Sequence, residues 1–235
     1  MEVSALPTDK VYEKRLGDGS PVTLRLGAYK QLRITVTGPG EVRITAPSRV
    51  GVRAALAFAN EHLGWIERHR AEVIARAEAA PQFTTGERVR LWGEAYPLRV
   101  AAGKPGAAFD GECVTITVPE GSDADMRRAA LVELYRRELA AAIPPLIAKY
   151  AALLDVEPPA WSLRDMRTRY GSCTAARKTV RFSLILAEKP HECLEYVVAH
   201  ELTHLRIHGH GADFHALVRS VYPDEQRARA LLRQS

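Results

Sequence analysis

The sequence is poor in cysteine. Its three cysteines, Cys113, Cys173 and Cys193, are odd in number and widely spaced, which argues against a small secreted domain held together by disulfides. The first twenty residues also lack the apolar segment of a secretory signal peptide. We therefore expect a protein of the reducing cytoplasm.

Long hydrophobic runs are absent as well. Hydrophobic residues make up 46% of the 235 positions, yet they never form the run of about 20 apolar residues that a membrane-spanning helix needs. An apolar fraction of this size is enough to bury a core. We therefore expect a globular protein with no membrane partner.

A strong excess of one charge is also missing, because 33 Lys and Arg residues face 28 Asp and Glu residues. Basic side chains concentrate locally at 164–181, "RDMRTRYGSCTAARKTVR". No aromatic ladder or nucleic-acid motif accompanies them, so a solvated face with ion pairs is the favoured interpretation. This segment is also the candidate for a weak nucleic-acid contact.

The first part of the chain predicts β-structure. Apolar and polar residues alternate with period two in three segments separated by turn signals, at 22–26, 32–36 and 42–46. A meander is the simplest arrangement of these strands. From residue 52 to about residue 79 the period becomes helical, which predicts one amphipathic helix.

Alternation returns at 88–100 and 113–118, and predicts a second hairpin or small sheet. The helix expected next has Ser122 or Asp123 as its cap. It is kinked or split by two adjacent prolines, Pro144 and Pro145.

Residues 179–186, "TVRFSLIL", alternate again and predict a further strand. The whole pattern indicates an α+β fold with a β-rich N-terminal portion, 1–121, and a helical portion, 122–235. We find no internal repeat in the sequence and expect one compact unit.

The stretch "VVAHELTHLRIHGHGADF", residues 197–214, holds four histidines and a glutamate. No Pro or Gly lies between Leu194 and Ile207, which predicts a helix there. His200 and His204 are one turn apart, so two imidazoles can reach one metal ion at about 2.0 to 2.1 Å from each nitrogen. Glu201 shares this face but is displaced from the pair, where its carboxylate can reach a metal-bound water.

A catalytic zinc needs a third protein ligand and an open fourth position. We favour His210, because the flanking glycines let the chain leave the helix and turn back. His208 and His215 are its rivals. Asp213 is a candidate to orient a ligand histidine, and Cys173 is interpreted as a small buried residue rather than a nucleophile.

Together these segments resemble the signature of the YgjP-like metallopeptidases, which are relatives of the SprT and WLM zinc peptidases. The resemblance rests on "RDMRTRYGSC", "FSLILAEKPHECLEYVVAHELTHLRIHGHGADF" and "VYPD", supported in front by "GPGEVRITAP", "NEHLGWIERH" and "TTGERVRLWGEAYPL". It covers roughly residues 20–225. The sequence departs from the family pattern, which has Trp, Asn, Asn, Ser and Trp, at Tyr170, Ser183, Gly209, Gly211 and His215.

The resemblance implies a zincin-like C-terminal portion whose active-site helix carries HExxH. It also implies zinc ligands at His200, His204 and His210, with Glu201 as general base. A peptide or protein would be the substrate.

We therefore expect a zinc-dependent peptidase in which Glu201 takes a proton from water and passes it to the leaving amine. An extended peptide would pair with the free edge of strand 179–186. The alternatives are a zinc-containing module that binds nucleic acid and a SprT-like protease that acts on DNA-associated protein. Glu201 argues against the binding module, since a structural zinc site closes its fourth position with a protein ligand and needs no base.

Overall fold

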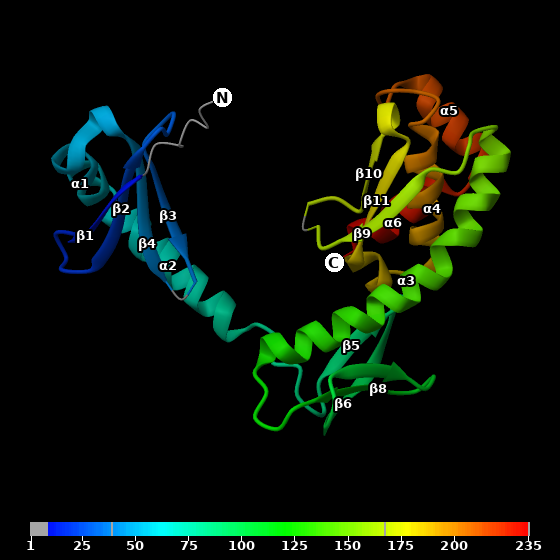
Figure 1. Cartoon of the computed structure of the whole chain (residues 1–235), viewed down its shortest axis with the longest axis horizontal. Helices are drawn as coiled ribbons and strands as arrows, with labels where there is room; N and C mark the ends of the chain where they lie inside the picture. Colours follow the sequence, from blue (N-terminus) through cyan, green and yellow to red (C-terminus); the bar gives the residue numbers. More distant parts are fainter. Residues whose placement is uncertain (1–8, 39, 167, 235) are drawn as a thin grey trace, which may run out of the picture. The chain divides into compact units, whose positions relative to one another are not determined.

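The computed structural model describes residues 9–234 except 39 and 167. It is α+β, as the sequence predicted, but it contains two compact units, Met1–Ala80 and Pro81–Ser235 (Figure 1). Each unit has its own hydrophobic core. The sequence predicted one compact unit with a junction near residue 121, whereas the structure divides the chain after residue 80. The physical reason is that the strands after Pro81 bury their apolar face against the helix that follows them.

The first unit is built on a four-stranded sheet. Its strands, in the spatial order β1-β2-β4-β3, are β1 (Lys10–Arg15), β2 (Pro21–Gly27), β4 (Glu41–Pro47) and β3 (Arg33–Thr37). The three predicted strands are confirmed, and β1 is an addition. The prediction of a meander is wrong, because β2 and β4 are parallel neighbours with Leu24 opposite Ile44. This pairing places the two strands with the most buried residues at the centre of the sheet.

The helix predicted from residue 52 to residue 79 is two helices. A short 3₁₀ turn, η1 (Ser48–Val50), precedes α1 (Gly51–Glu61) and α2 (Leu63–Glu78). They meet at His62, whose φ of −108° lies outside the helical range. There the backbone N–H bonds three residues back, to the carbonyl of Ala59, and the His62 ring contacts the carbonyl of Phe58 at 2.7 Å.

The second unit begins with another four-stranded sheet. Its strands, in the order β5-β6-β8-β7, are β5 (Arg88–Leu91), β6 (Glu94–Ala102), β8 (Val114–Val118) and β7 (Gly106–Phe109). Again the two central strands are parallel and the outer pairs are antiparallel. The pattern V-x-I-T-x-P occurs in both parallel strands, as "VRITAP" at 42–47 and "VTITVP" at 114–119. The chain therefore contains an internal repeat, and the prediction that it has none is wrong.

The helix that covers this second sheet is α3 (Ala124–Leu154). Asp123 is its N-cap and accepts a hydrogen bond from the backbone N–H of Met126 at 2.8 Å. Pro144 and Pro145 lie inside the helix, which bends and continues rather than splitting (Figure 1). Its bent path carries the chain from the sheet to the rest of the unit.

A three-stranded sheet of order β10-β11-β9 follows. Its strands are β9 (Ala160–Arg164), β10 (Gly171–Thr174) and β11 (Thr179–Ser183), with η2 (Ala175–Arg177) between the last two. The strand predicted at 179–186 ends early, because η3 (Leu184–Glu188) replaces its second half. This 3₁₀ turn buries Leu184, Leu186 and Ala187 in the core, so the apolar residues are buried without forming a strand.

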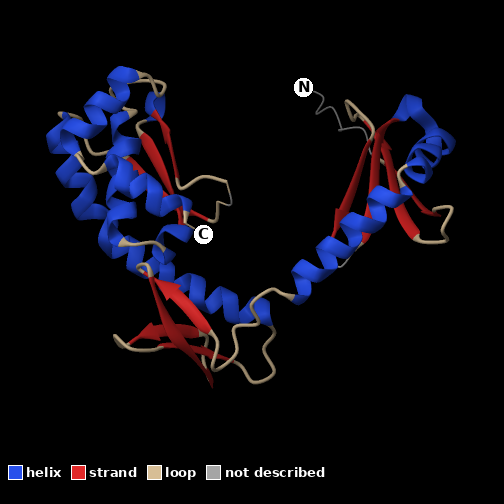
Figure 2. Cartoon of the chain, turned by 180° about the vertical axis from the view of Figure 1, so that it is seen from behind, coloured by secondary structure: helices blue, strands red, loops and turns tan. Residues whose placement is uncertain are grey.

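Three helices complete the unit: α4 (His191–Thr203), α5 (Ala212–Val221) and α6 (Glu225–Arg233). They gather beside the β9–β11 sheet (Figure 2). Helix α4 is central, since it contacts α3, α5, α6 and β10. Within the part of the chain that the structure describes, no helix is both long and apolar enough to cross a membrane.

Candidate metal centre

Helix α4 is buried on nearly every side. Its buried residues are Cys193, Leu194, Tyr196, Val197, Val198, Ala199, Glu201, Leu202 and Thr203. The helix ends at Thr203, earlier than the predicted Ile207, and His204 is its C-cap. The Thr203 hydroxyl donates to the carbonyl of Ala199 at 2.8 Å, and the next turn tightens, with Leu205 N–H bonded three residues back to Leu202.

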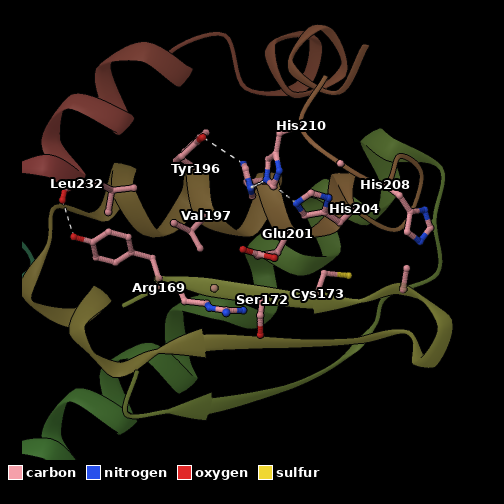
Figure 3. Close-up of a pocket in the computed structure, with 15 residues that line it drawn as sticks. Arg169, Ser172, Cys173, Tyr196, Val197, Glu201, His204, His208, His210 and Leu232 are labelled. Atoms are coloured by element: carbon pink, nitrogen blue, oxygen red, sulfur yellow. Dashed lines mark hydrogen bonds between the residues drawn. The ribbon is translucent and has the colours of Figure 1, made fainter. Parts of the chain in front are cut away.

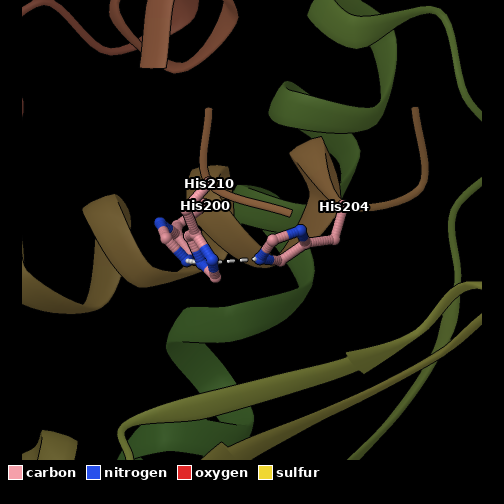
Figure 4. Close-up of side chains that lie close together, drawn as sticks. All are labelled: His200, His204 and His210. Carbon is pink, nitrogen blue, oxygen red and sulfur yellow. Dashed lines mark hydrogen bonds between the residues drawn. The ribbon is translucent and has the colours of Figure 1, made fainter. Parts of the chain in front are cut away.

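Three histidine side chains converge beside the end of α4 (Figure 4). The Nε2 atom of His210 lies 3.1 Å from that of His200 and 3.2 Å from that of His204. One potential ligand atom from each residue lies within 4.8 Å of the other two. Gly209, with φ of 85°, supplies the left-handed turn that brings His210 back toward the helix.

These distances fit a divalent metal ion. Tetrahedral zinc with Zn–N bonds of about 2.0 to 2.1 Å places its nitrogen ligands about 3.3 Å apart. The two Nε2–Nε2 separations of 3.1 and 3.2 Å are close to that value. His200, His204 and His210 can therefore hold such an ion together.

Hydrogen bonds at the far nitrogens orient two of the rings. Nδ1 of His204 lies 3.2 Å from the carbonyl oxygen of Ile207. A carbonyl only accepts, so this Nδ1 carries the proton and Nε2 keeps its lone pair. Nδ1 of His200 lies 3.3 Å from the hydroxyl of Tyr196. This partner was missed from the sequence, although a tyrosine one turn before His200 on the same helix was a usable signal.

Burial favours the neutral form of the two helix histidines. It lowers the pKa of His200 to about 3, with a smaller contribution from the nearby His204 and His210. Burial also lowers the pKa of His204. Neutral imidazole is the form that ligates a metal.

Glu201 lies between α4 and the strand that carries Ser172 and Cys173 (Figure 3). Its side chain is only 6% exposed, and burial raises its pKa to about 7, against the opposing charge of Arg169. Gly171 leaves room for it, because a Cβ atom there would stand 2.5 Å from Oε1 of Glu201. Within the described residues no hydrogen bond engages this carboxylate, so it is available to a substrate or a water molecule.

The histidines and Glu201 line one cavity of roughly 530 Å³. Its remaining lining residues are Arg169, Tyr170, Gly171, Ser172, Cys173, Ala175, Tyr196, Val197, His208, Gly209 and Leu232. The sheet edge that borders it is β10, because β11 is the central strand and pairs on both sides. The prediction that strand 179–186 offers the free edge is therefore wrong.

The other candidates from the sequence lie apart from the three converging nitrogens. His208 is exposed on the cavity wall, and His215 bonds Glu225 at 2.7 Å. No hydrogen bond joins Asp213 to a histidine in the described part of the chain. Cys173 is half-buried, and desolvation together with the charge of Glu201 raises the pKa of its thiol to about 11, so it is not an activated nucleophile.

The basic segment 164–181 begins at the last residue of β9 and continues through β10, η2 and β11. Two of its members form ion pairs, Asp165 with Arg128 at 3.1 Å and Lys178 with Glu157 at 2.5 Å. Arg169 lines the cavity instead, and Arg167 lies outside the described residues.

Known protein families include one that matches nearly all of this chain. The family model described as "YgjP-like, metallopeptidase domain" matches residues 30–235. Among solved structures, the chain is similar to the metallopeptidase zymogen jannalysin of Methanocaldococcus jannaschii. The two share 22% sequence identity with a TM-score of 0.34, over 40% of this chain and 90% of that chain. Comparison with curated proteins gives no match.

Proposed function

Because the chain belongs to the YgjP-like metallopeptidase family, we propose that it hydrolyses peptide bonds with zinc as its metal and Glu201 as its general base. The observation that carries this proposal is the position of Glu201 in the same cavity as three converging imidazole nitrogens. A metal site with three protein ligands keeps its fourth position open for water or substrate.

His200, His204 and His210 would hold the zinc ion. When bound, zinc polarises the scissile carbonyl and lowers the pKa of a water molecule to about 7. The Ile207 carbonyl fixes the tautomer of His204 that can bind metal, and burial keeps His200 neutral. The donor set supports zinc, because imidazole nitrogens suit this ion well.

Glu201 would move the proton. In the metal-free protein burial raises its pKa to about 7, and a carboxyl group whose pKa lies near the working pH can both accept a proton and return it. It would take the proton from the attacking water and deliver it to the nitrogen of the leaving amine. Gly171 positions it by allowing the β10 backbone to approach the carboxylate closely.

The substrate would be an extended peptide that adds to the β10 edge. Gly171, Ser172 and Cys173 of this strand line the cavity. Backbone hydrogen bonds to a strand edge grip a peptide without requiring particular side chains. We place the activity in the cytoplasm, where free thiols such as Cys113, Cys173 and Cys193 stay reduced.

The proposal is tested with Glu201→Gln and His204→Ala, using metal analysis beside a peptide-library digest. We expect Glu201→Gln to keep zinc and to lose about 10²-fold or more in kcat/KM, since it lacks the base. His204→Ala should lose both zinc and hydrolysis. Unchanged turnover in zinc-loaded Glu201→Gln would refute the assigned base.

His208→Ala is the matched control, because His208 lines the same cavity outside the converging set. It should keep one zinc ion per chain. Loss of zinc from His208→Ala together with its retention in His204→Ala would overturn the ligand set. Repeating the digest with DNA present separates a plain peptidase from a DNA-associated one. Added DNA should increase the rate of hydrolysis by a DNA-associated protease and leave that of a plain peptidase unchanged.

A further inference from the structure

One aromatic ring contacts all three histidines. The Phe214 ring centroid lies 4.9 Å from that of His200, 4.5 Å from that of His204 and 4.9 Å from that of His210. It is stacked on His204, with an interplanar angle of 27°, and meets the other two edge to face. Phe214 is fully buried, with 0% of its surface exposed.

The helix that carries Phe214 is fixed in place. Phe214 lies in the first turn of α5, and the next residue, His215, donates from Nδ1 to Glu225 at 2.7 Å. Glu225 is only 2% exposed and also pairs with Arg219 and Arg229, at 3.5 and 3.4 Å. This buried carboxylate joins the start of α5 to the start of α6, so the Phe214 ring has little freedom to move away.

We propose that Phe214 is a positioning residue that sets the metal affinity of the site by holding the three imidazoles converged. A histidine ring turns about its outer torsion with only a broad preference. Contact with one shared ring removes that freedom from three side chains at once, before any metal binds. An apolar neighbour also keeps water away from that side of the ligand set, which is a recognised control on metal sites.

Leucine at position 214 would be buried equally well but would lack the aromatic ring that stacks on His204 and meets His200 and His210 edge to face. The inference thus separates two roles of Phe214, namely filling the core and orienting the ligands. It rests on the metal site of the proposed function, but not on peptide hydrolysis.

The experiment is a titration of metal-free protein with zinc against a chromophoric chelator, for wild type and Phe214→Leu. We expect the zinc Kd to rise about 10- to 100-fold, the range found when groups that orient metal ligands are changed. The absorption spectrum of the cobalt-substituted variant should also change, because its ligand rings would adopt a different geometry.

Val218→Ala is the matched control. Val218 is one turn further along α5 and is also fully buried, so this variant loosens the same helix and leaves the ring in place. Its zinc Kd should stay within about threefold of wild type, which is below the effect of about tenfold or more expected when a group that orients metal ligands is changed. A Kd for Phe214→Leu that stays within this limit, or equal weakening in both variants, would overturn the inference. Wild-type protein that binds no zinc at all would instead overturn the proposed function and, with it, this role for Phe214.

Discussion

The sheets β1–β4 and β5–β8 have the same strand order and the same parallel central pair, but they serve different parts of the molecule. Equivalent residues occupy their centres: Ile44 pairs with Ile34 in the first sheet, and Ile116 pairs with Ala107 in the second. In the first unit α1 and α2 close the core. In the second, the core under the sheet is continuous with that of α4 and α5. The same arrangement of strands thus forms a separate core in the first unit and shares its core with the helices of the candidate metal centre in the second.

The first hairpin of each sheet shows how this difference arises. In the second sheet the β5–β6 turn carries Trp92, which stacks on His191, the first residue of α4, with ring centroids 3.8 Å apart. Its backbone N–H also bonds the carbonyl of Ala187 at 2.7 Å. In the first sheet the β1–β2 turn instead connects to that unit's own helix α1, because the Gly17 N–H donates to Oδ1 of Asn60 at 2.7 Å. One side chain at a turn therefore connects the second sheet to the helix that bears the site.

The largest expected difference between the units is their response to metal. Removing zinc with a chelator should lower the stability of the second unit alone, since the candidate ligands all belong to it. Ligand at 1,000 times its Kd stabilises a folded protein by about 4 kcal/mol. Calorimetry should show one transition that shifts with zinc and one that does not. A shift of both transitions would show that the units unfold together.

Substitutions at the two sheet centres provide a matched pair. Ile44 and Ile116 are both fully buried, with 0% exposure, and each change to Ala should cost about 3 to 4 kcal/mol. We expect Ile44→Ala to destabilise only the first unit and to leave the heat stability of hydrolysis unchanged. Ile116→Ala should lower that heat stability. Equal loss of activity on heating would contradict the separation of the two cores.

The metal-free second unit should also carry a pH signature that the first unit lacks. The pKa of Glu201 is raised from 4.5 to about 7 in the native state. Between these two pH values the carboxyl group is ionised in the unfolded chain but still protonated in the native state, so the native state loses stability as pH rises. Glu201→Gln has no such loss. Its unfolding free energy, compared with that of wild type, should therefore increase over this range and then stay constant.

At about 1.4 kcal/mol for each pKa unit, this increase amounts to about 3 kcal/mol. His200 titrates in both proteins and so cancels from the difference. Urea denaturation at pH 4 and pH 8 measures the effect. An equal difference at both values would show that Glu201 titrates normally.

The smallest expected effect concerns the helices that follow the two sheets. Asp123 caps α3 through its bond to Met126 N–H, whereas the N-cap of α1, Val50, makes no such bond. Asp123→Ala should cost the second unit about 1 kcal/mol. The first unit's transition should not move in the same thermal scan. A loss much above this value would mean that Asp123 does more than cap the helix.

Short-range features of the second unit were predictable. The helix after Leu194, the cap at Asp123 and the bend at Pro144 each follow from local chemistry. Strands in the first unit followed from alternation, but their order did not. An alternation of apolar and polar residues with period two shows which residues share a face of the sheet, but it does not show which strand lies next to which.

Features that depend on distant contacts were missed or misplaced. Strand β10, which forms the edge of its sheet, lies in the basic segment 164–181 and was not predicted. The free edge was assigned to β11, which is the central strand. Phe214 and Glu225 had no signal in the sequence that linked them to the histidines, because that link passes through the folding of α5 and α6 onto α4. The repeat is not evident from the sequence, because only a few residues of each copy are alike.

By itself, the sequence determined that His200, Glu201 and His204 share one side of a helix end, because the rise and turn of an α-helix fix the relation of residues four apart. The flanking glycines favoured His210 as the third member, but only the tertiary structure decided between it and its rivals His208 and His215. Tertiary structure alone decided that Phe214 contacts all three rings, and that Gly171 and burial surround Glu201 closely enough to raise its pKa. Local geometry is set by covalent connection and backbone hydrogen bonds. Convergence and desolvation depend on which distant surfaces pack together, and no spacing along the chain records that.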